Sequence, residues 1–576
     1  MTQSRNQNRK TRLTLERLES RELLAGMLTI TRVGGEYLLA GTDGAEEFKI
    51  QSQSTAGSFK VIGLNNTKIN GAAESTLTGV SSLNLLLRGG DDTASLDMSV
   101  NSIFNLPGSF TFNGGEGNNS LVVGGLLAPV GNSVRIGGSL VVSGGSGKDT
   151  VSIQAGGETI VQGLASFNFG NGESNLMASK LTVHGGGGLT INAYQGNDVV
   201  NLGGLSVARD VEMNLGTGKV NVTINGNAGV FQPTVPSKIG GNLTVNAYGT
   251  DGTVSVYNDL AVNGSVNANL GEFGSMILGS GNITVNSIYV SAKNLSVSTL
   301  GMLTVKNNVT FAGGTATVVD IHGSTKIEGD LTWYGGNGGL GNRFSVGAFS
   351  TSPIFIGGNA NFISGRSELN EISIQSTATN PGSVIAGDFK VIGSSGTDNV
   401  TLDNVNVKRN VNVALGSGQN RLTLGQGIGQ VSIGGFLTID SGEGRDNVQF
   451  LRAIVSKLTS INLGDGVDTV NIADSTFNAF YLYTGNGDDV VNMESGSLGT
   501  QGLSRFLGAV YVDLGRGNDK LRIGSKSAVP PRSVAFAVDA VFSGGHGLND
   551  FDSIDAKYTG SPRFFYFGTS TTGNSG

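Results

Sequence analysis

A glycine–aspartate motif recurs along the chain and carries its best candidate ligands for a metal ion. Residues 144–152 read GGSGKDTVS, so that Asp149 follows two spaced glycines. Other copies of the motif place an aspartate in the same slot, and the clearest are Asp446, Asp468, Asp489 and Asp519. Ca²⁺ prefers about six to eight oxygen ligands from carboxylates and carbonyls. The motif therefore makes these five aspartates calcium candidates.

The nonapeptide at 144–152 is similar to the glycine-rich repeat of RTX proteins, whose turns and aspartates bind Ca²⁺. Here the nonapeptide is not continued in tandem, because residues 153–161 read IQAGGETIV. Each coil offers one carboxylate, so a neighbouring coil would have to complete a site, and the spacing of 22 and 21 residues between Asp446, Asp468 and Asp489 favours a shared column there. The alternative is that each aspartate closes a glycine turn through local backbone hydrogen bonds, without a metal.

Acid–base catalysis on a polysaccharide is the other chemistry to weigh, because right-handed β-helices also carry lyases and glycoside hydrolases. Such enzymes need clustered carboxylates in a groove, usually with aromatic platforms. The only adjacent aspartates are Asp91–Asp92 and Asp488–Asp489, and neighbours on a strand point to opposite faces. The single tryptophan and the three histidines are far apart in sequence: Trp333, His184, His322 and His546. We therefore expect no enzyme, and keep a polysaccharide-active one as the alternative.

The glycine–aspartate motif lies between two stretches of alternating apolar residues. Residues 134–153 read VRIGGSLVVSGGSGKDTVSI, and residues 431–450 read VSIGGFLTIDSGEGRDNVQF. Alternation with period two predicts a strand on each side of a glycine turn. The middle glycines recur every 21 to 30 residues, a period that indicates a solenoid. One glycine turn per copy, followed by a longer return, favours parallel stacking over a meander of hairpins.

These patterns predict an all-β fold. The expected architecture is an elongated parallel β-solenoid that winds in the right-handed sense, as in a β-helix. Some 20 coils stacked at about 4.8 Å would form a rod on the order of 95 Å long. Between about 250 and 380 the glycine turn degrades while the strands persist. We expect one solenoid over 27–567, with end caps near 27–60 and 525–567, and a disordered tail over 568–576.

Composition narrows the classes of function. The chain has 576 residues, of which 93 are glycine, 9 are proline and none is cysteine, and its formal net charge is −7. The absence of cysteine excludes disulfides and thiolate metal sites. No basic face is evident beyond the first residues, so nucleic acid is not an expected partner. No apolar run is long enough for a transmembrane helix.

The N-terminal segment carries a resemblance that bears on location. Residues 11–26 read TRLTLERLESRELLAG, a pattern typical of a short amphipathic helix. The segment resembles the LEPR-XLL N-terminal motif of large secreted or surface proteins of planctomycete bacteria. The matching positions include Leu18, Glu19, Arg21, Leu23 and Leu24. The family usually has proline where this chain has Ser20, which leaves the function of the signal open.

This resemblance implies that residues 1–26 are a sorting or export segment and that the protein reaches the cell surface or the extracellular space. The leading hypothesis is therefore an exported structural or adhesive β-solenoid. Its expected partners are polysaccharide or protein of the cell envelope or matrix, and its oligomeric state stays open. Two alternatives remain: a carbohydrate-active β-helix, and a calcium-binding RTX-like repeat protein. No cofactor other than Ca²⁺ is expected.

Overall fold

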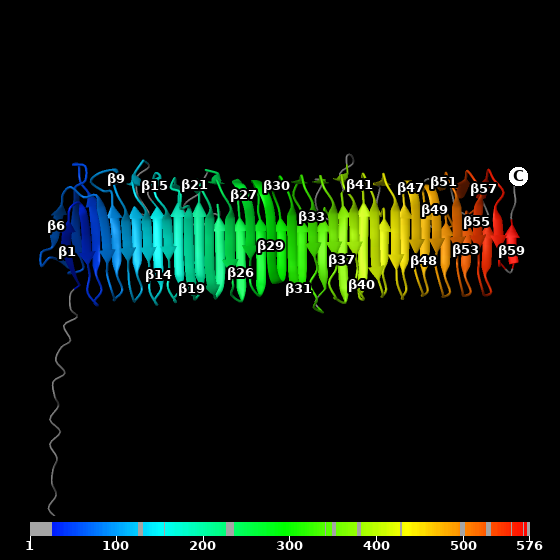
Figure 1. Ribbon diagram of the computed structural model, residues 1–576, viewed down its shortest axis with the longest axis horizontal. Coiled ribbons are helices and arrows are strands. Elements are labelled where there is room, and N and C mark those ends of the chain that lie inside the picture. Colours follow the sequence, from blue (N-terminus) through cyan, green and yellow to red (C-terminus); the bar gives the residue numbers. More distant parts are fainter. Residues whose placement is uncertain are drawn as a thin grey trace, which may run out of the picture.

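The computed structural model shows an elongated parallel β-solenoid of about 18 turns (Figure 1). It describes residues 26–572 except 125–130, 155, 226–234, 340, 348–352, 377–381, 427–428, 496–501, 526–530, 554–555 and 568. Strands make up 61% of the structure, and no helix occurs among the described residues. The predicted fold is confirmed, with about 18 coils where about 20 were expected. The helix predicted near the N-terminus falls on residues 1–25, outside the described part.

Each coil contributes one strand to each of three faces, so that a strand pairs in parallel with the third strand after it. In one coil these are β13 (Leu140–Ser143), β14 (Asp149–Gln154) and β15 (Thr159–Val161). They pair with β16 (Ala165–Asn168), β17 (Ser174–Ser179) and β18 (Leu181–Val183), respectively. We call the faces that contain β13, β14 and β15 the first, second and third face.

The first face begins each coil and leads into the glycine turn. Its inward side chains are apolar, as at Leu140 and Val142, while Val141 and Ser143 point outward. Its other strands are β2 (Glu36–Ala40), β7 (Ser82–Leu86), β10 (Phe110–Asn113), β19 (Leu189–Gln195), β22 (Val211–Thr217), β25 (Leu243–Ala247), β33 (Leu331–Tyr334), β36 (Ala360–Ile363), β39 (Phe389–Ile392), β42 (Val411–Gly416), β45 (Leu437–Ser441), β52 (Val510–Asp513), β55 (Ala540–Ser543) and β58 (Arg563–Phe565).

The second face follows the glycine turn and holds the aspartates of the motif. Its other strands are β3 (Glu47–Ser52), β8 (Thr93–Asp97), β11 (Ser120–Gly124), β20 (Asp198–Gly203), β23 (Lys219–Ile224), β26 (Asp251–Val256), β28 (Phe273–Leu278), β34 (Asn342–Val346), β37 (Leu369–Gln375), β40 (Thr397–Asp403), β43 (Arg421–Leu424), β46 (Asn447–Leu451), β48 (Thr469–Ala473), β50 (Val490–Met493), β53 (Lys520–Ile523), β56 (Asp550–Ser553) and β59 (Thr569–Thr572). Because β59 pairs with β56, the last coil extends into the range predicted as a disordered tail.

The third face has the shortest strands and closes the coil. Its other strands are β9 (Ile103–Leu106), β12 (Ser133–Ile136), β21 (Ser206–Val207), β24 (Ser237–Ile239), β30 (Met302–Val305), β32 (Thr325–Ile327), β35 (Ile354–Ile356), β38 (Ser383–Ile385), β41 (Val405–Val407), β44 (Val431–Ile433), β51 (Leu503–Phe506), β54 (Ser533–Phe536) and β57 (Ala556–Tyr558). Near the C-terminal end its core is aromatic, where the ring of Phe506 lies 5.4 Å from that of Phe477 and 5.1 Å from that of Phe536.

Five long strands run through a corner instead of stopping at it: β27 (Leu260–Asn269), β29 (Asn282–Thr299), β31 (Val309–Ile321), β47 (Ala453–Asn462) and β49 (Thr476–Tyr483). β29 passes without a break from the third face through the first face to the second face. It pairs with β27, β28, β30 and β31. Three of the five lie within 250–380, so the expectation that the strands persist where the glycine turn degrades is confirmed.

The N-terminal end is closed by antiparallel strands. β1 (Met27–Val33) pairs antiparallel with β2, and β4 (Phe59–Leu64) pairs antiparallel with β3 and with β6 (Glu74–Leu77). β5 (Lys68–Ile69) pairs in parallel with β1. The cap therefore reaches Leu77, beyond the range of 27–60 that the sequence predicted. No helix among the described residues is long and apolar enough to cross a membrane.

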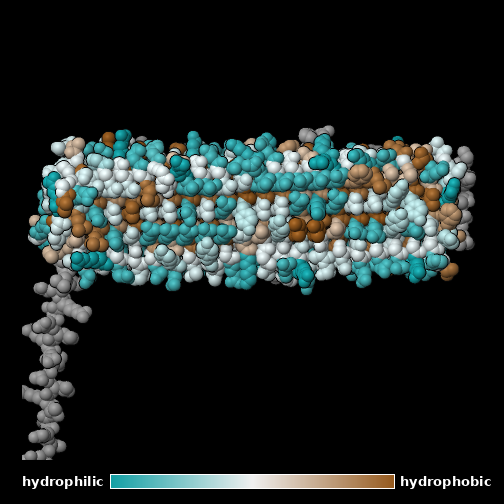
Figure 2. Space-filling model, in the orientation of Figure 1, coloured by the Kyte–Doolittle hydropathy of each residue, from teal (hydrophilic) through white to brown (hydrophobic). Residues whose placement is uncertain are grey.

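Regular rows of side chains run along the outside of the rod (Figure 2). Asparagines occupy an outward-facing position in several first-face strands and form an amide ladder. In this ladder each asparagine side chain donates to the side-chain oxygen of the one before it. Asn192 donates to Asn168 at 2.7 Å, Asn246 to Asn214 at 2.8 Å and Asn269 to Asn246 at 2.8 Å. Side-chain amides thus bond successive coils to one another on the outside of the rod.

Candidate functional site

The five calcium candidates lie in one column inside the solenoid. Asp149, Asp446, Asp468, Asp489 and Asp519 each occupy the first inward position of the second face, directly after the glycine turn, and each is at most 4% exposed. Parallel register aligns them with asparagines in other coils. We call this the Asx column, and its members are Asp92, Asn119, Asp149, Asp198, Asn342, Asn370, Asp398, Asn420, Asp446, Asp468, Asp489, Asp519 and Asn549.

Glycine is required in the turn that precedes the Asx column because successive turns stack without room for a side chain. A Cβ on Gly466 would lie 1.5 Å from the carbonyl oxygen of Gly444, and one on Gly487 would lie 1.4 Å from that of Gly466. Real Cβ contacts are never this short, so alanine there would have to move backbone. The abundance of glycine thus follows from the stacking of coils, in addition to the turn itself.

The Asx column forms a ladder of hydrogen bonds from coil to coil. The backbone N–H of Asp446 donates to Oδ1 of Asp468 at 2.9 Å, and that of Asp468 donates to Oδ1 of Asp489 at 2.8 Å. The next two rungs, from Asp489 to Asp519 and from Asp519 to Asn549, are both 2.9 Å long. Each side chain therefore holds the backbone of the preceding coil, a role that the sequence analysis did not assign.

Asparagine and aspartate differ in what the other end of the side chain does. Nδ2 of Asn420 donates to the carbonyl of Gly416 in its own turn at 3.1 Å, and Nδ2 of Asn549 donates to Gly544 at 2.6 Å. At Asp468 and Asp519 the corresponding atom is Oδ2, which is buried and has no hydrogen-bond partner. An acceptor therefore stands where the asparagine coils use a donor.

Some aspartates of the column have found donors for both oxygens. Oδ2 of Asp398 accepts the N–H of Ser394 at 2.8 Å, and Oδ2 of Asp446 accepts the hydroxyl of Ser441 at 2.6 Å. Asp149 accepts both the backbone N–H and Nδ2 of Asn119 on one oxygen, Oδ1. Unpartnered Oδ2 atoms remain at Asp92, Asp198, Asp468, Asp489 and Asp519.

Burial dominates the electrostatics of the column. Desolvation raises the pKa of Asp468 to about 7, with repulsion from Asp489 adding to the shift. Desolvation also raises the pKa of Asp519 to about 7, and that of Asp92, beside Glu46, to about 8. The pKa values of Asp149, Asp446 and Asp489 are raised for the same reason. A proton on Oδ2 would turn the orphaned acceptor into a donor.

Calcium remains a prediction for this column. Among the described residues, no group of three or more histidine, cysteine, aspartate or glutamate side chains is arranged to hold a metal ion. The structure brings the five candidate aspartates into one column but supplies a single carboxylate from each coil. Any Ca²⁺ bound there would take its remaining oxygens from turn carbonyls.

The candidate acid pairs do not converge. Asp92 and Asp489 are buried in the column, whereas their neighbours Asp91 and Asp488 are exposed and accept backbone N–H groups of the following coil. Trp333 is fully buried against Phe344 and Phe362. His184 and His546 are exposed, and His322 is half-buried. Neither the acid pairs nor Trp333 forms the acidic groove with aromatic platforms that a polysaccharide-active enzyme needs.

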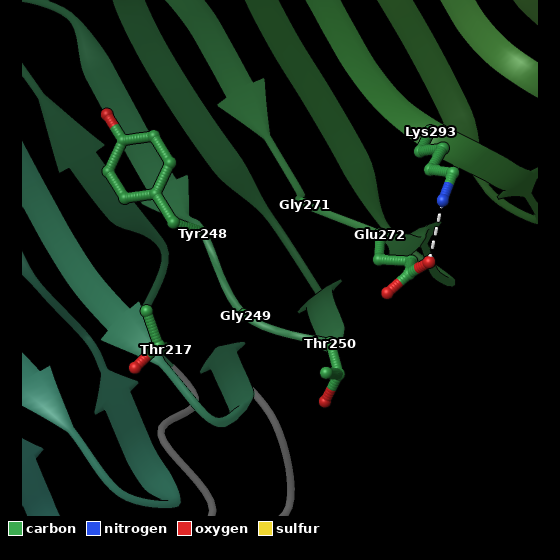
Figure 3. A pocket seen from close by; sticks show the side chains of 7 residues that line it. All are labelled: Thr217, Tyr248, Gly249, Thr250, Gly271, Glu272 and Lys293. Atoms are coloured by element: carbon green, nitrogen blue, oxygen red, sulfur yellow. Dashed lines mark hydrogen bonds and ion pairs between the residues drawn. The ribbon is translucent and has the colours of Figure 1, made fainter.

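The sequence analysis missed an open cavity at the corner between the first and second faces (Figure 3). Its volume is about 450 Å³, and it is lined by Thr217, Tyr248, Gly249, Thr250, Gly271, Glu272 and Lys293. Tyr248 and the Glu272–Lys293 ion pair lie on opposite sides of the glycine segments (Figure 3). Nζ of Lys293 is 2.8 Å from Oε1 of Glu272. The available signal was the loss of the glycine–aspartate motif from about residue 250.

Comparison with known proteins gives no function to carry over. No family model and no curated protein sequence matches the chain. The sorting-motif positions, Leu18, Glu19, Arg21, Leu23 and Leu24, lie outside the described residues. The function is therefore argued from the residues and their arrangement.

Proposed function

We propose that the protein is an exported structural or adhesive rod of the cell surface or extracellular space. The observation that carries this proposal is the regular stack of about 18 turns, in which buried acids hold the coils together and rows of amides and hydroxyls face outward. In a solenoid each coil contacts only its neighbours, so length and stiffness accumulate with repetition. Such a rod offers many equivalent weak contacts along its faces.

The location of the rod is proposed from the resemblance of residues 18–25 to the LEPR-XLL motif. The expected partners are polysaccharide or protein of the envelope or matrix, because the outward rows supply hydrogen-bond donors and acceptors at regular intervals. Asn214, for example, donates to Asn192 and to Glu212 and accepts from Asn246, which leaves one lone pair of its amide oxygen for a partner. This repetition suits a polymer better than a compact ligand.

A polysaccharide-active enzyme is a weaker proposal. The acids best placed by sequence are engaged in structural bonds: Oδ1 of Asp489 holds the backbone of Asp468, and Oδ1 of Asp488 accepts the N–H of Asn518 at 2.8 Å. General acid–base chemistry on a glycosidic bond needs two carboxyl groups facing one substrate.

Surface labelling of intact cells tests the proposed location. The full chain should be labelled by a membrane-impermeant reagent, and a chain lacking residues 1–26 should not. The double variant Leu23→Asp/Leu24→Asp should behave like the truncation, whereas Leu13→Asp, outside the matching positions, should be labelled like the wild type. Retention of the full-length protein in the cytoplasm would contradict the proposal.

A further inference from the structure

The open cavity interrupts a ridge of stacked glycine turns. A Cβ on Gly218 would lie 1.6 Å from the carbonyl oxygen of Gly196, and one on Gly249 would lie 1.8 Å from that of Gly218, so these turns are in close register. Two coils later β29 runs through this corner as continuous strand, and Lys293 stands where a turn would protrude. The ridge therefore ends in a notch, which we define by the seven residues that line it.

The interior of the corner changes at the same coils. The Asx column is replaced there by residues without a polar side chain, in the parallel register Val220, Gly252, Gly274 and Leu295. Without an Asx side chain to hold a full turn, the corner is tighter. The shape of the notch thus follows from the residues that replace the Asx column in these coils, and it does not depend on the conformation of one side chain.

The walls of the notch combine one aromatic ring with several hydrogen-bonding groups. Tyr248 is 64% exposed, so its ring is free to contact a ligand. The opposite wall is the Glu272–Lys293 pair, and the side chains of Thr217 and Thr250 add two hydroxyls (Figure 3). The floor is formed by Gly249 and Gly271, neither of which has a side chain to fill the space.

The charges around the notch cancel in pairs. Lys293 faces Glu272 at 2.8 Å, and beside the notch Lys219 faces Asp251 at 3.8 Å. Among the described residues that line the notch, the one cation and the one carboxylate therefore balance each other. The ligand that this chemistry favours is neutral and carries both donors and acceptors next to an apolar face.

We propose that the notch binds one or two sugar rings of a neutral polysaccharide. The C–H face of a pyranose would cover the Tyr248 ring, while its hydroxyls would donate to Glu272 and accept from Lys293. This site deepens the proposed function, on which it rests for the presence of such a polymer outside the cell. It gives the rod one defined contact in addition to its regular rows.

Other occupants fit less well. A stable protein partner needs about 20–30 residues on each side of the interface, whereas seven residues line the notch. An acidic polysaccharide or a nucleic acid would need unpaired cations, and Lys219 and Lys293 both face carboxylates. A neutral polymer meets neither obstacle and can pass through a notch that is open to solvent.

Calorimetric titration of the purified full chain tests the proposal. The probes are neutral hexasaccharides of (1→4)-linked glucose and of (1→4)-linked mannose, with a hexasaccharide of (1→4)-linked galacturonic acid for comparison. We expect saturable binding of at least one neutral probe that changes little with salt. Tyr248→Ala should weaken it at least about tenfold, and Tyr248→Phe should retain most of it. Glu272→Gln/Lys293→Met should also weaken it.

The matched control is Tyr483→Ala, which removes another exposed tyrosine of the first face far along the rod. This variant should bind like the wild type. Binding of neither neutral probe, or of the acidic probe alone, would overturn the proposal. A Tyr248→Ala variant that binds like the wild type would place sugar binding elsewhere and overturn the assignment of the notch as the binding site. The proposed surface function would not be affected by that result. Conversely, cytoplasmic retention would overturn the surface function without changing the titration.

Discussion

The side chain of each residue in the Asx column has two polar atoms that need hydrogen-bond partners. One faces the backbone of the preceding coil, and the other faces the turn of its own coil. An asparagine meets both needs, as Asn420 does: its oxygen accepts the N–H of Asp398 in the preceding coil, and its amide donates to its own turn. An aspartate meets the first need equally well, but it meets the second only with a nearby donor or a proton. Asp446 has the Ser441 hydroxyl, whereas the Oδ2 atoms of Asp468 and Asp519 have no partner. The cost of an unpartnered buried acceptor falls on these two residues and, in the same way, on Asp92, Asp198 and Asp489.

We predict that the rod loses stability as pH rises, and that Asp468→Asn/Asp519→Asn removes much of this loss. The folded-state pKa of both aspartates is raised from 3.8 to about 7, so the folded form holds their protons in a range where the unfolded form has released them. Their contribution is therefore fully present below about pH 4 and is lost as pH rises through 7. At pH 8 the double variant should be more stable by about 1–3 kcal/mol per site, and the difference should vanish near pH 4.

Chemical denaturation at several pH values measures this difference. The control is Asp440→Asn, an exposed aspartate that does not contribute to the raised pKa values of the column, and it should leave the pH profile unchanged. A calcium site would give another pattern. Melting temperature would then rise with calcium and fall with a chelator at constant pH, and the double variant would lose that response. We expect no calcium response, because each coil supplies only one carboxylate.

The sequence contained a signal for the inward aspartates. In the pattern D-x-V-x-I, period two places Asp149 on the same side of the strand as Val151 and Ile153, which are buried. The glycines before it favoured the interpretation that the aspartate belongs to the turn. Asp149 receives a second hydrogen bond from the Asn119 side chain, whereas Asp468 receives only the backbone N–H of Asp446. This difference depends on the residue in the adjacent coil, which no local motif reveals.

At the scale of the element, the strand–turn–strand unit was predictable because alternation and glycine spacing are both local. The third face was not predicted, since strands such as β21 have only two residues and show no period. The continuous strand β29 was equally hidden, because its 18 residues read as separate alternating stretches. The notch escaped prediction for this reason, since it exists only where neighbouring coils differ in the length of their turn.

The stacked turns make a sharp prediction about glycine. We expect Gly466→Ala to destabilise the protein by at least about 2 kcal/mol, because its Cβ would lie 1.5 Å from a backbone oxygen of the neighbouring coil. Gly186→Ala is the matched control, since a Cβ there has no heavy atom within 4 Å and its backbone is not in the left-handed region. Thermal denaturation compares the two variants. Equal effects would show that the coils can move apart and that close stacking does not explain the glycines.

At the scale of the whole molecule, the rod is a one-dimensional array whose coils couple to their neighbours. The Asx column is not uniform along it. Unpartnered carboxylate oxygens occur at Asp92, at Asp198 and at the three successive aspartates Asp468, Asp489 and Asp519, while the coils around Val220 and Leu295 carry no acid in that slot. Because stability in such an array is a sum of coil and interface terms, a local change in charge should stay local. The antiparallel cap at the N-terminal end lies far from the coils of Asp468 and Asp519 and close to that of Asp92 (Figure 1).

We therefore predict that raising the pH from about 5 to about 8 loosens only the coils whose aspartate has a pKa raised to about 7 or 8, which are those of Asp468 and Asp519 and, beside the N-terminal cap, that of Asp92. Amide hydrogen exchange should increase across the coils that hold Asp468 and Asp519, after correction for the intrinsic effect of pH on exchange, and should stay unchanged between Val220 and Leu295. The physical reason is that deprotonation leaves buried charge in those coils, and each opening breaks ladder bonds only to the adjacent turns. In the double variant Asp468→Asn/Asp519→Asn the regional increase should disappear. An increase spread evenly along the chain would contradict nearest-neighbour coupling, and no increase at all would show that these carboxyls stay protonated or find partners.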